Sequence, residues 1–116
     1  RAPAPKGVEA YVVTATADAF KSMRWSARTA TGMPKTVAGV RQVAYLETTD
    51  PAGELIDLQF LESDAAASKE FGAIRAKYKA FNLVRIRNVL VFRHPSGASA
   101  VSDTDLAAIR HALRAA

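Results

Sequence analysis

The sequence contains no cysteine among its 116 residues, only two histidines, and no long uncharged run of apolar residues. The lack of cysteine excludes a disulfide framework, a thiolate nucleophile and a cysteine-ligated zinc or iron–sulfur site. No apolar segment approaches the roughly 18 residues that a membrane-spanning helix needs. Hydrophobic residues make up 49% and charged residues 23%, as in an ordinary globular domain, so we expect a packed core.

Motifs for catalysis and for metal or phosphate binding are also missing. The two histidines, His94 and His111, form no metal-binding pair, and the sequence has no EF-hand loop, P-loop or G-x-G-x-x-G pattern. His94 lies near Ser96 and Ser99, but no G-x-S-x-G elbow and no third orienting residue accompany it. We therefore expect no catalytic residue, no metal site and no cofactor, and an enzyme is not the favoured interpretation.

The charges are divided into two blocks. Sixteen Lys and Arg against eleven Asp and Glu give a net charge of +5. Residues 47–64 hold six acids and no base, whereas residues 75–93 hold six bases and no acid. A basic protein invites a nucleic-acid or anionic-membrane partner, but an acidic block folded beside the bases would weaken their field. We interpret the bases as a solvated surface and do not expect nucleic-acid binding.

The first seven residues, RAPAPKG, alternate proline with alanine and predict an extended linker before a single domain spanning residues 8–116. A short tether of this kind is typical of the segment that remains after a secretion signal or lipid anchor is trimmed. We therefore expect an extracytoplasmic location, periplasmic or tethered to the cell surface, in a bacterial secreted protein or lipoprotein. A chain cut at an arbitrary boundary would look the same.

The first half of the domain predicts three strands and one helix. Residues 8–16, VEAYVVTAT, are rich in β-branched side chains and predict the first strand. Phe20, Met23 and Ala27 then recur at helical spacing, in a helix that Gly32 and Pro34 would end. Residues 37–48 and 54–61 predict two strands that pair antiparallel across a five-residue turn.

The second half predicts two further helices around one strand. Ser63 caps a helix that ends near Phe81, and Ser102 caps the last helix, whose buried stripe is Leu106, Ile109 and Leu113. Between them, residues 83–92, LVRIRNVLVF, predict a strand in which Asn88 marks a bulge or a short dividing turn. Val84, Ile86, Leu90 and Phe92 would share one face of that strand.

The resulting order predicts a ferredoxin-like βαββαβ sandwich in the α+β class. Its four-stranded antiparallel sheet would carry two helices on one face, with a further helix at the C-terminus. The other face of the sheet would then be open to water, a ligand, the last helix or a second subunit. A register slip of one residue would exchange the two faces.

Two segments resemble parts of known families. The stretch GELIDLQFLESDAAASKEF resembles the third strand and second helix of the RNA-recognition motif, which implies nucleic-acid binding on the sheet. That family places aromatic side chains on the exposed face, where this sequence has Leu55 and Asp57. The stretch AYVVTATADAFKSM is similar to the start of the peptidoglycan-binding SPOR domain of exported bacterial proteins, which implies an envelope protein.

Four residues are candidate contacts for a partner. Tyr11, Arg85 and Arg87 would lie on the open face of the sheet, and Trp25 lies two positions away from the buried stripe of its predicted helix. The alternative for Trp25 is a ring folded over the edge of that helix. We expect a non-enzymatic, tethered binding or accessory module of the cell envelope, with a protein or an envelope component as its partner.

Two other functions stay open. One is a small enzyme of the dimeric α/β-barrel type, in which two copies pair their sheets around an enclosed pocket with His94 near its rim. The other is a nucleic-acid binder resembling the RNA-recognition motif. The first of these requires a homodimer, whereas the second predicts binding that falls steeply with salt.

Overall fold

A computed structural model of the chain describes residues 10–30, 42–94 and 97–115. Within them, three helices accompany a five-stranded antiparallel sheet with the strand order β1-β2-β3-β5-β4. No helix among these residues is both long and apolar enough to cross a membrane. In chain order the elements are α1 (Val13–Ser22), β1 (Ser26–Ala30), β2 (Gln42–Thr49), β3 (Leu55–Leu61), α2 (Asp64–Lys77), β4 (Val84–Ile86), β5 (Val89–Arg93) and α3 (Asp103–Ala112).

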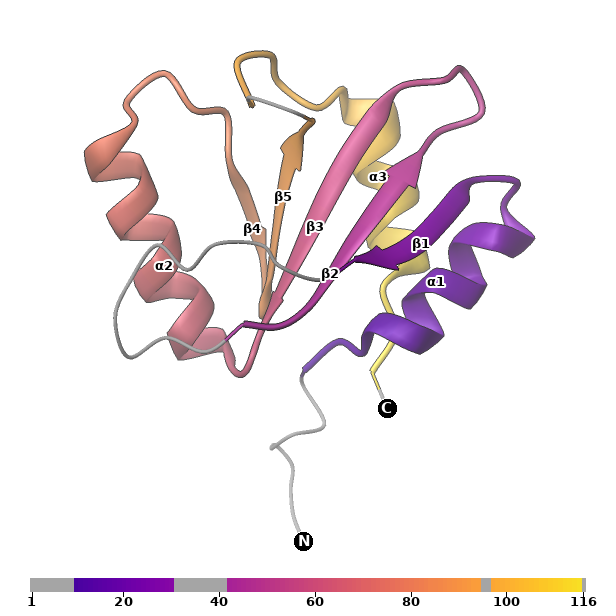
Figure 1. Cartoon of the computed structure of the whole chain (residues 1–116), viewed down its shortest axis with the longest axis horizontal. Coiled ribbons are helices and arrows are strands. Elements are labelled where there is room, and N and C mark those ends of the chain that lie inside the picture. The colour runs from indigo at the N-terminus through magenta and orange to yellow at the C-terminus, as the bar shows by residue number, and fades with distance from the viewer. Residues whose placement is uncertain (1–9, 31–41, 95–96, 116) are drawn as a thin grey trace, which may run out of the picture.

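Helices lie on both faces of the sheet (Figure 1). On one face α1 and α3 pack together over a large apolar core, which includes Phe20, Leu58 and Ile109. On the other face α2 packs on β3, β4 and β5 over a smaller core, which includes Ile74 and Leu90. The main contacts of α2 are with β3, β4 and β5, so the side of this face formed by β1 and the end of β2 lies beside α2 and not under it.

The prediction of a first strand over residues 8–16 is wrong from Val13 onwards, because a helix, α1, occupies residues 13–22. Its β-branched residues favour a strand locally, but Val13, Ala17 and Phe20 also share one helical face and pack into the larger core. Tertiary packing of that face outweighs the weak local preference. The layout that resembled a SPOR domain, a strand followed by a helix, is therefore not present in residues 10–23.

The prediction that the first helix continues through Ala27 is also wrong. The helix ends at Ser22, and Arg24 takes the left-handed backbone conformation with φ 71°. This turn sends the chain back along the sheet edge as β1, Ser26–Ala30. The predicted linker, residues 1–7, and the predicted stop at Gly32 and Pro34 lie outside the described residues.

Other predicted elements are confirmed. The chain pairs β2 and β3 antiparallel across the predicted turn, although residues 37–41 lie outside the described range. The hydroxyls of Ser63 and Ser102 accept the backbone N–H groups of Ala66 at 3.0 Å and Asp105 at 3.1 Å, so both begin helices. The helix that begins after Ser63 ends at Lys77, four residues before the expected Phe81.

The predicted strand over residues 83–92 divides into β4 and β5, with Arg87 and Asn88 as the two-residue turn between them. The turn brings Val84 opposite Val91 and Ile86 opposite Val89, so these four share the larger core. This corrects the expectation that Val84 and Ile86 share a face with Leu90 and Phe92, which instead face α2.

The α+β class with an antiparallel sheet is confirmed, but the ferredoxin-like details differ. The described sheet has five strands instead of four, and its order places β1 at an edge, whereas the first strand was expected at the centre. The first described element is a helix, and helices cover both faces. Misassignment of residues 8–16 and 20–27 accounts for most of this difference.

Asn88 holds the N-terminal end of the described chain against the end of β3. Its buried side chain accepts the N–H of Tyr11 at 2.7 Å and donates to the carbonyl oxygens of Tyr11 at 3.2 Å and Leu61 at 3.1 Å. Tyr11 also forms an isolated antiparallel bridge with Ala115. The residues before α1 and after α3 therefore lie side by side next to the β4–β5 turn.

Candidate functional site

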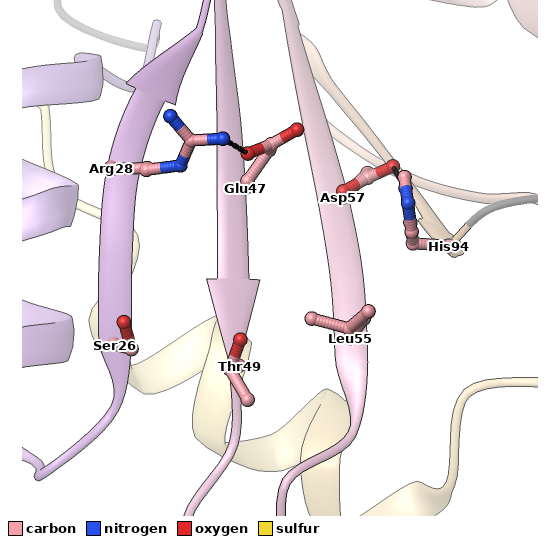
Figure 2. Close-up of a pocket in the computed structure, with 7 residues that line it drawn as sticks. All are labelled: Ser26, Arg28, Glu47, Thr49, Leu55, Asp57 and His94. Atoms are coloured by element: carbon pink, nitrogen blue, oxygen red, sulfur yellow. Dashed lines mark hydrogen bonds and ion pairs between the residues drawn. The ribbon is translucent and has the colours of Figure 1, made fainter.

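A hollow of about 320 Å³ lies on the α2-bearing face of the sheet, at the part that α2 leaves uncovered. We call it the sheet hollow. Strands β1, β2 and β3 provide its floor, and the residue after β5 closes one side (Figure 2). Its lining residues are Ser26, Arg28, Glu47, Thr49, Leu55, Asp57 and His94.

Four charged or ionisable side chains form a row across the sheet hollow (Figure 2). Arg28 pairs with Glu47 at 2.6 Å, and His94 Nδ1 lies 2.8 Å from Asp57 Oδ2. Glu47 and Asp57 stand directly opposite each other on β2 and β3, an arrangement that is unfavourable for two like charges. Arg28 and His94, at the two ends, provide the partners that compensate for this repulsion. We call these four residues the ionic row.

Asp57 is the buried member of the ionic row, with a side chain only 3% exposed, whereas the side chain of His94 is 37% exposed. The Tyr45 hydroxyl donates a hydrogen bond to Asp57; burial, that bond and the nearby charges of Asp57 and Glu47 raise the pKa of Tyr45. The backbone N–H of His94 donates to the carbonyl of Leu55 at 3.2 Å. Asp57 therefore fixes the position of the imidazole, which stays partly exposed.

A second cross-strand row completes the floor of the sheet hollow. Ser26 pairs with Thr49, and Thr49 with Leu55, so two hydroxyl groups and one apolar side chain lie beside the ionic row. Leu55 is 47% exposed, which is unusual for a large apolar residue on a sheet. This half of the hollow offers neutral hydrogen-bonding groups and an apolar contact.

A further hollow of about 370 Å³ adjoins the first on the other side of His94. Both are lined by His94 and Leu55, and the second adds Arg93, Gly97 and Ser99. The imidazole therefore lines both depressions. A ligand in either one can reach it.

The three carboxylates of Asp50, Glu54 and Asp105 offer oxygens within 4.8 Å of one another, between the β2–β3 turn and the start of α3. Burial, with the hydrogen bond and charge of Asp50, raises the pKa of Asp105 to about 6. Burial opposes ionisation of Asp50, but the backbone N–H of Glu54 and the Asp105 hydrogen bond outweigh it and lower its pKa. Below about pH 6, Asp50 and Asp105 therefore share one proton. Arg93 pairs with Glu54. These partners account for the cluster structurally.

The four residues predicted as contacts lie away from the sheet hollow. Trp25 is 5% exposed and packs on Phe20 with ring centroids 4.9 Å apart, so its ring is part of the larger core and offers almost no surface to a partner. Arg85 and Arg87 are exposed on β4 and the following turn, at the edge of the sheet opposite β1. Tyr11 is partly buried beside that turn through Asn88.

Sequence reasoning considered His94 but not its pairing with Asp57. The two residues are 37 positions apart, and no local spacing joins them. The one available signal was the outward register of Leu55 and Asp57 on β3, which correctly separates them from Ile56 and Leu58 in the larger core.

The sheet hollow combines donors, acceptors and an apolar contact within one depression. Arg28 and His94 supply nitrogen donors, Glu47 supplies a carboxylate, and the hydroxyls of Ser26 and Thr49 can donate or accept. Such a mixture suits recognition of a polar ligand at a site of defined geometry. No protein-family model matches the sequence, and no curated protein or solved structure shows significant similarity to it.

Proposed function

We propose that this protein is a binding domain that holds a small, hydroxyl-bearing ligand, such as a sugar unit, in the sheet hollow. The observation that carries the proposal is the ionic row, which lines a depression on the part of the sheet that α2 leaves uncovered. A folded domain seldom places two facing carboxylates on a sheet unless their partners are fixed beside them. Arg28 and His94 fill that role here.

The pairing within the ionic row favours a neutral ligand. Arg28 and Glu47 neutralise each other, so their pair offers a strongly charged ligand little net attraction. A hydroxyl group can accept from Arg28 and donate to Glu47 while the pair stays formed. The exposed side chain of Leu55 supplies the apolar contact that one face of a sugar ring requires.

This proposal keeps the function expected from the sequence, a binding module that uses a sheet face, but moves the contact surface. The contacts would come from Arg28, Glu47 and His94 in place of Tyr11, Arg85 and Arg87. The extracytoplasmic, tethered location remains part of the proposal, and its support is the composition of residues 1–7. An envelope glycan is the kind of partner that would join the two ideas.

The test is an NMR titration of the ¹⁵N-labelled protein with N-acetylglucosamine, glucose, succinate and putrescine as separate probes. The proposal predicts amide shifts in β1, β2 and β3 around the sheet hollow with one of the two sugars and none with the two ions. Thr49→Val removes one hydroxyl at the site and should weaken the response. Thr14→Val, which makes the same change on the exposed face of α1, should leave it unchanged.

Two results would overturn the proposal. One is that neither sugar causes amide shifts around the sheet hollow. The other is an equal loss of response in Thr49→Val and Thr14→Val, since a site-specific contact cannot depend on both hydroxyls.

The Asp57–His94 pair supports a second candidate function, a hydrolase that uses His94 as a general base. A buried carboxylate bonded to Nδ1 fixes the tautomer and orientation of an imidazole, as in known acid–base sites. Nε2 would then take a proton from a water molecule that attacks a bound ester or amide, and would pass that proton to the alcohol or amine that leaves. Like the enzyme alternative raised from the sequence, this candidate uses His94, but it needs neither the second copy nor the paired sheets of that alternative.

Hydrolysis of p-nitrophenyl acetate separates the two functions. An enzyme should exceed the rate of free imidazole at the same concentration and should lose most of that excess in His94→Asn. His111→Asn, which removes the other histidine from the exposed face of α3, is the matched control. A rate no greater than that of imidazole would leave binding alone as the function.

A further inference from the structure

A separate groove of about 290 Å³ lies where α2 ends, between the following loop, β4 and the start of α3. Its apolar floor is formed by Leu83, Val84, Val101 and Leu106, of which Leu83 and Val101 are each 6% exposed. Two cationic side chains, Arg75 and Lys79, stand at its rim. We call it the basic groove. It shares no lining residue with the sheet hollow.

The cations of the basic groove are available to a ligand. No ion pair involves Arg75 or Lys79 within the described residues, and no acidic side chain lines the groove. The guanidinium carbon of Arg75 lies 5.6 Å from the centre of the Phe71 ring, which orients it. The C-terminal end of α2 contributes only about half a negative charge, so Arg75, Lys77 and Lys79 leave the region clearly positive.

The walls of the groove are fixed before any ligand binds. Asn82 ties the loop after α2 to the loop before α3: its N–H donates to the Gly97 carbonyl at 2.9 Å and its amide to the Ala98 carbonyl at 2.7 Å. The Phe81 ring lies directly against Gly97 and meets Phe92 edge to face, with centroids 5.4 Å apart. A preformed apolar groove with cations at one end avoids the cost of ordering itself on binding.

We propose that the basic groove binds a single-chain anionic amphiphile of the fatty-acid type. The carboxylate would lie between Arg75 and Lys79, and the chain would cover Leu83, Val84 and Val101. The groove volume of about 290 Å³ is just below the roughly 300–1,000 Å³ of ligand pockets, which suits one short chain and not the two chains of a bilayer lipid. This gives Arg75 and Lys79, two of the six bases in residues 75–93, a function beyond solvation, independently of the sheet hollow.

Isothermal titration calorimetry tests this with decanoate below its micelle concentration. Acetate, which has the headgroup without the chain, and decyltrimethylammonium, which has the chain with the opposite charge, should bind at least roughly tenfold more weakly. The double variant Arg75→Gln/Lys79→Gln should lose a similar factor. Lys69→Gln/Arg110→Gln removes the same charge from exposed positions outside the groove and should change the affinity less than about twofold.

A second pair of variants tests the apolar part of the groove. Ala100 lines it, so Ala100→Phe should fill the groove and abolish decanoate binding, whereas Ala65→Phe, at the exposed start of α2, should not. Circular dichroism confirms that each variant is folded. The proposal is overturned if the wild-type protein does not bind decanoate, if the cationic amphiphile binds equally well, or if the control variants lose as much as the groove variants. Binding to phosphatidylglycerol vesicles without binding to monomeric decanoate would also overturn it, in favour of a membrane surface.

Discussion

The shared proton between Asp50 and Asp105 makes the stability of the fold depend on pH in a direction opposite to that of most carboxylates. The pKa of Asp105 is raised from 3.8 to about 6 on folding, with burial as the largest cause and the Asp50 carboxylate next. Between these values the folded state binds more protons than the unfolded state. The free energy of unfolding therefore falls as pH rises through this interval, and the contribution of the protonated form is lost above pH 6.

The interval from 3.8 to about 6 corresponds to about 3 kcal/mol, at about 1.4 kcal/mol per pH unit. Asp105→Asn removes the charge that causes this loss, and its amide can still donate a hydrogen bond to Asp50. The variant gives up a favourable charge in the first turn of α3, worth about 0.3–1 kcal/mol. The lowered pKa of Asp50 offsets a further part of the roughly 3 kcal/mol. We therefore expect Asp105→Asn to be more stable than the wild-type protein by about 1–2 kcal/mol at about pH 8, and nearly equal to it at about pH 4.5.

Urea denaturation at the two pH values measures both differences. Asp103→Asn is the matched control, because Asp103 is an exposed carboxylate in the same helical turn. It loses the favourable charge without relieving any burial, so it should be slightly less stable at the higher pH. A gain for Asp105→Asn of equal size at both pH values, or no gain at the higher pH, would refute a shared proton.

Three further substitutions and one control test the packing and the backbone described above, each by urea denaturation. Gly97→Ala should destabilise the fold by about 2 kcal/mol or more, because Gly97 has φ +70° and its new Cβ would overlap the Phe81 ring; Gly72→Ala, in open space on α2, should instead stabilise it by about 0.5–1 kcal/mol. Equal effects at the two glycines would contradict this contact. Asn88→Ala deletes three hydrogen bonds from a buried side chain and should cost about 2–4 kcal/mol, so a neutral result would refute its linking role. Arg24→Gly should stabilise the fold by up to about 1 kcal/mol, since φ 71° suits glycine; a loss would show that the side chain contributes.

The elements that could be predicted are those decided by neighbouring residues. A serine hydroxyl that accepts an N–H three residues later marks a helix start within one turn of sequence, which is why Ser63 and Ser102 were assigned correctly. The turn after β2 was similarly predictable, because Asp50 accepts the N–H of Glu54 at 2.8 Å and Gly53 adopts φ +93°.

The elements that could not be predicted depend on distant partners. Residues 12–17 alternate in the manner of a strand, and only the burial of Phe20 against α3 and the sheet decides for a helix. Strand β1 has one buried residue, Ala27, among polar neighbours, so its sequence carries almost no strand signal. It exists because Arg24 turns the chain and β2 provides a partner.

The candidate site follows the same division. Register on β3 correctly placed Asp57 on the face opposite Ile56, since alternation is a local property. The ionic row, in contrast, draws one residue from each of β1, β2 and β3 and one from the end of β5, so it depends on strand order. A prediction with the wrong strand order therefore cannot place Arg28 and His94 in the same hollow.

The contact between the two ends of the described chain constrains the order in which the elements fold. The N–H of Val12 donates to the carbonyl of Arg114 at 2.7 Å, and α1 packs on α3. During synthesis α1 leaves the ribosome long before α3 is made. Phe20 therefore lacks the part of its core that α3 provides until the last residues are synthesised. The β2–β3 hairpin, whose strands are adjacent in sequence, can pair first because its loop is short. Nascent chains halted before residue 103 should therefore expose the apolar face of α1, which a chaperone can bind. Packing of α3 on α1 ends this exposure.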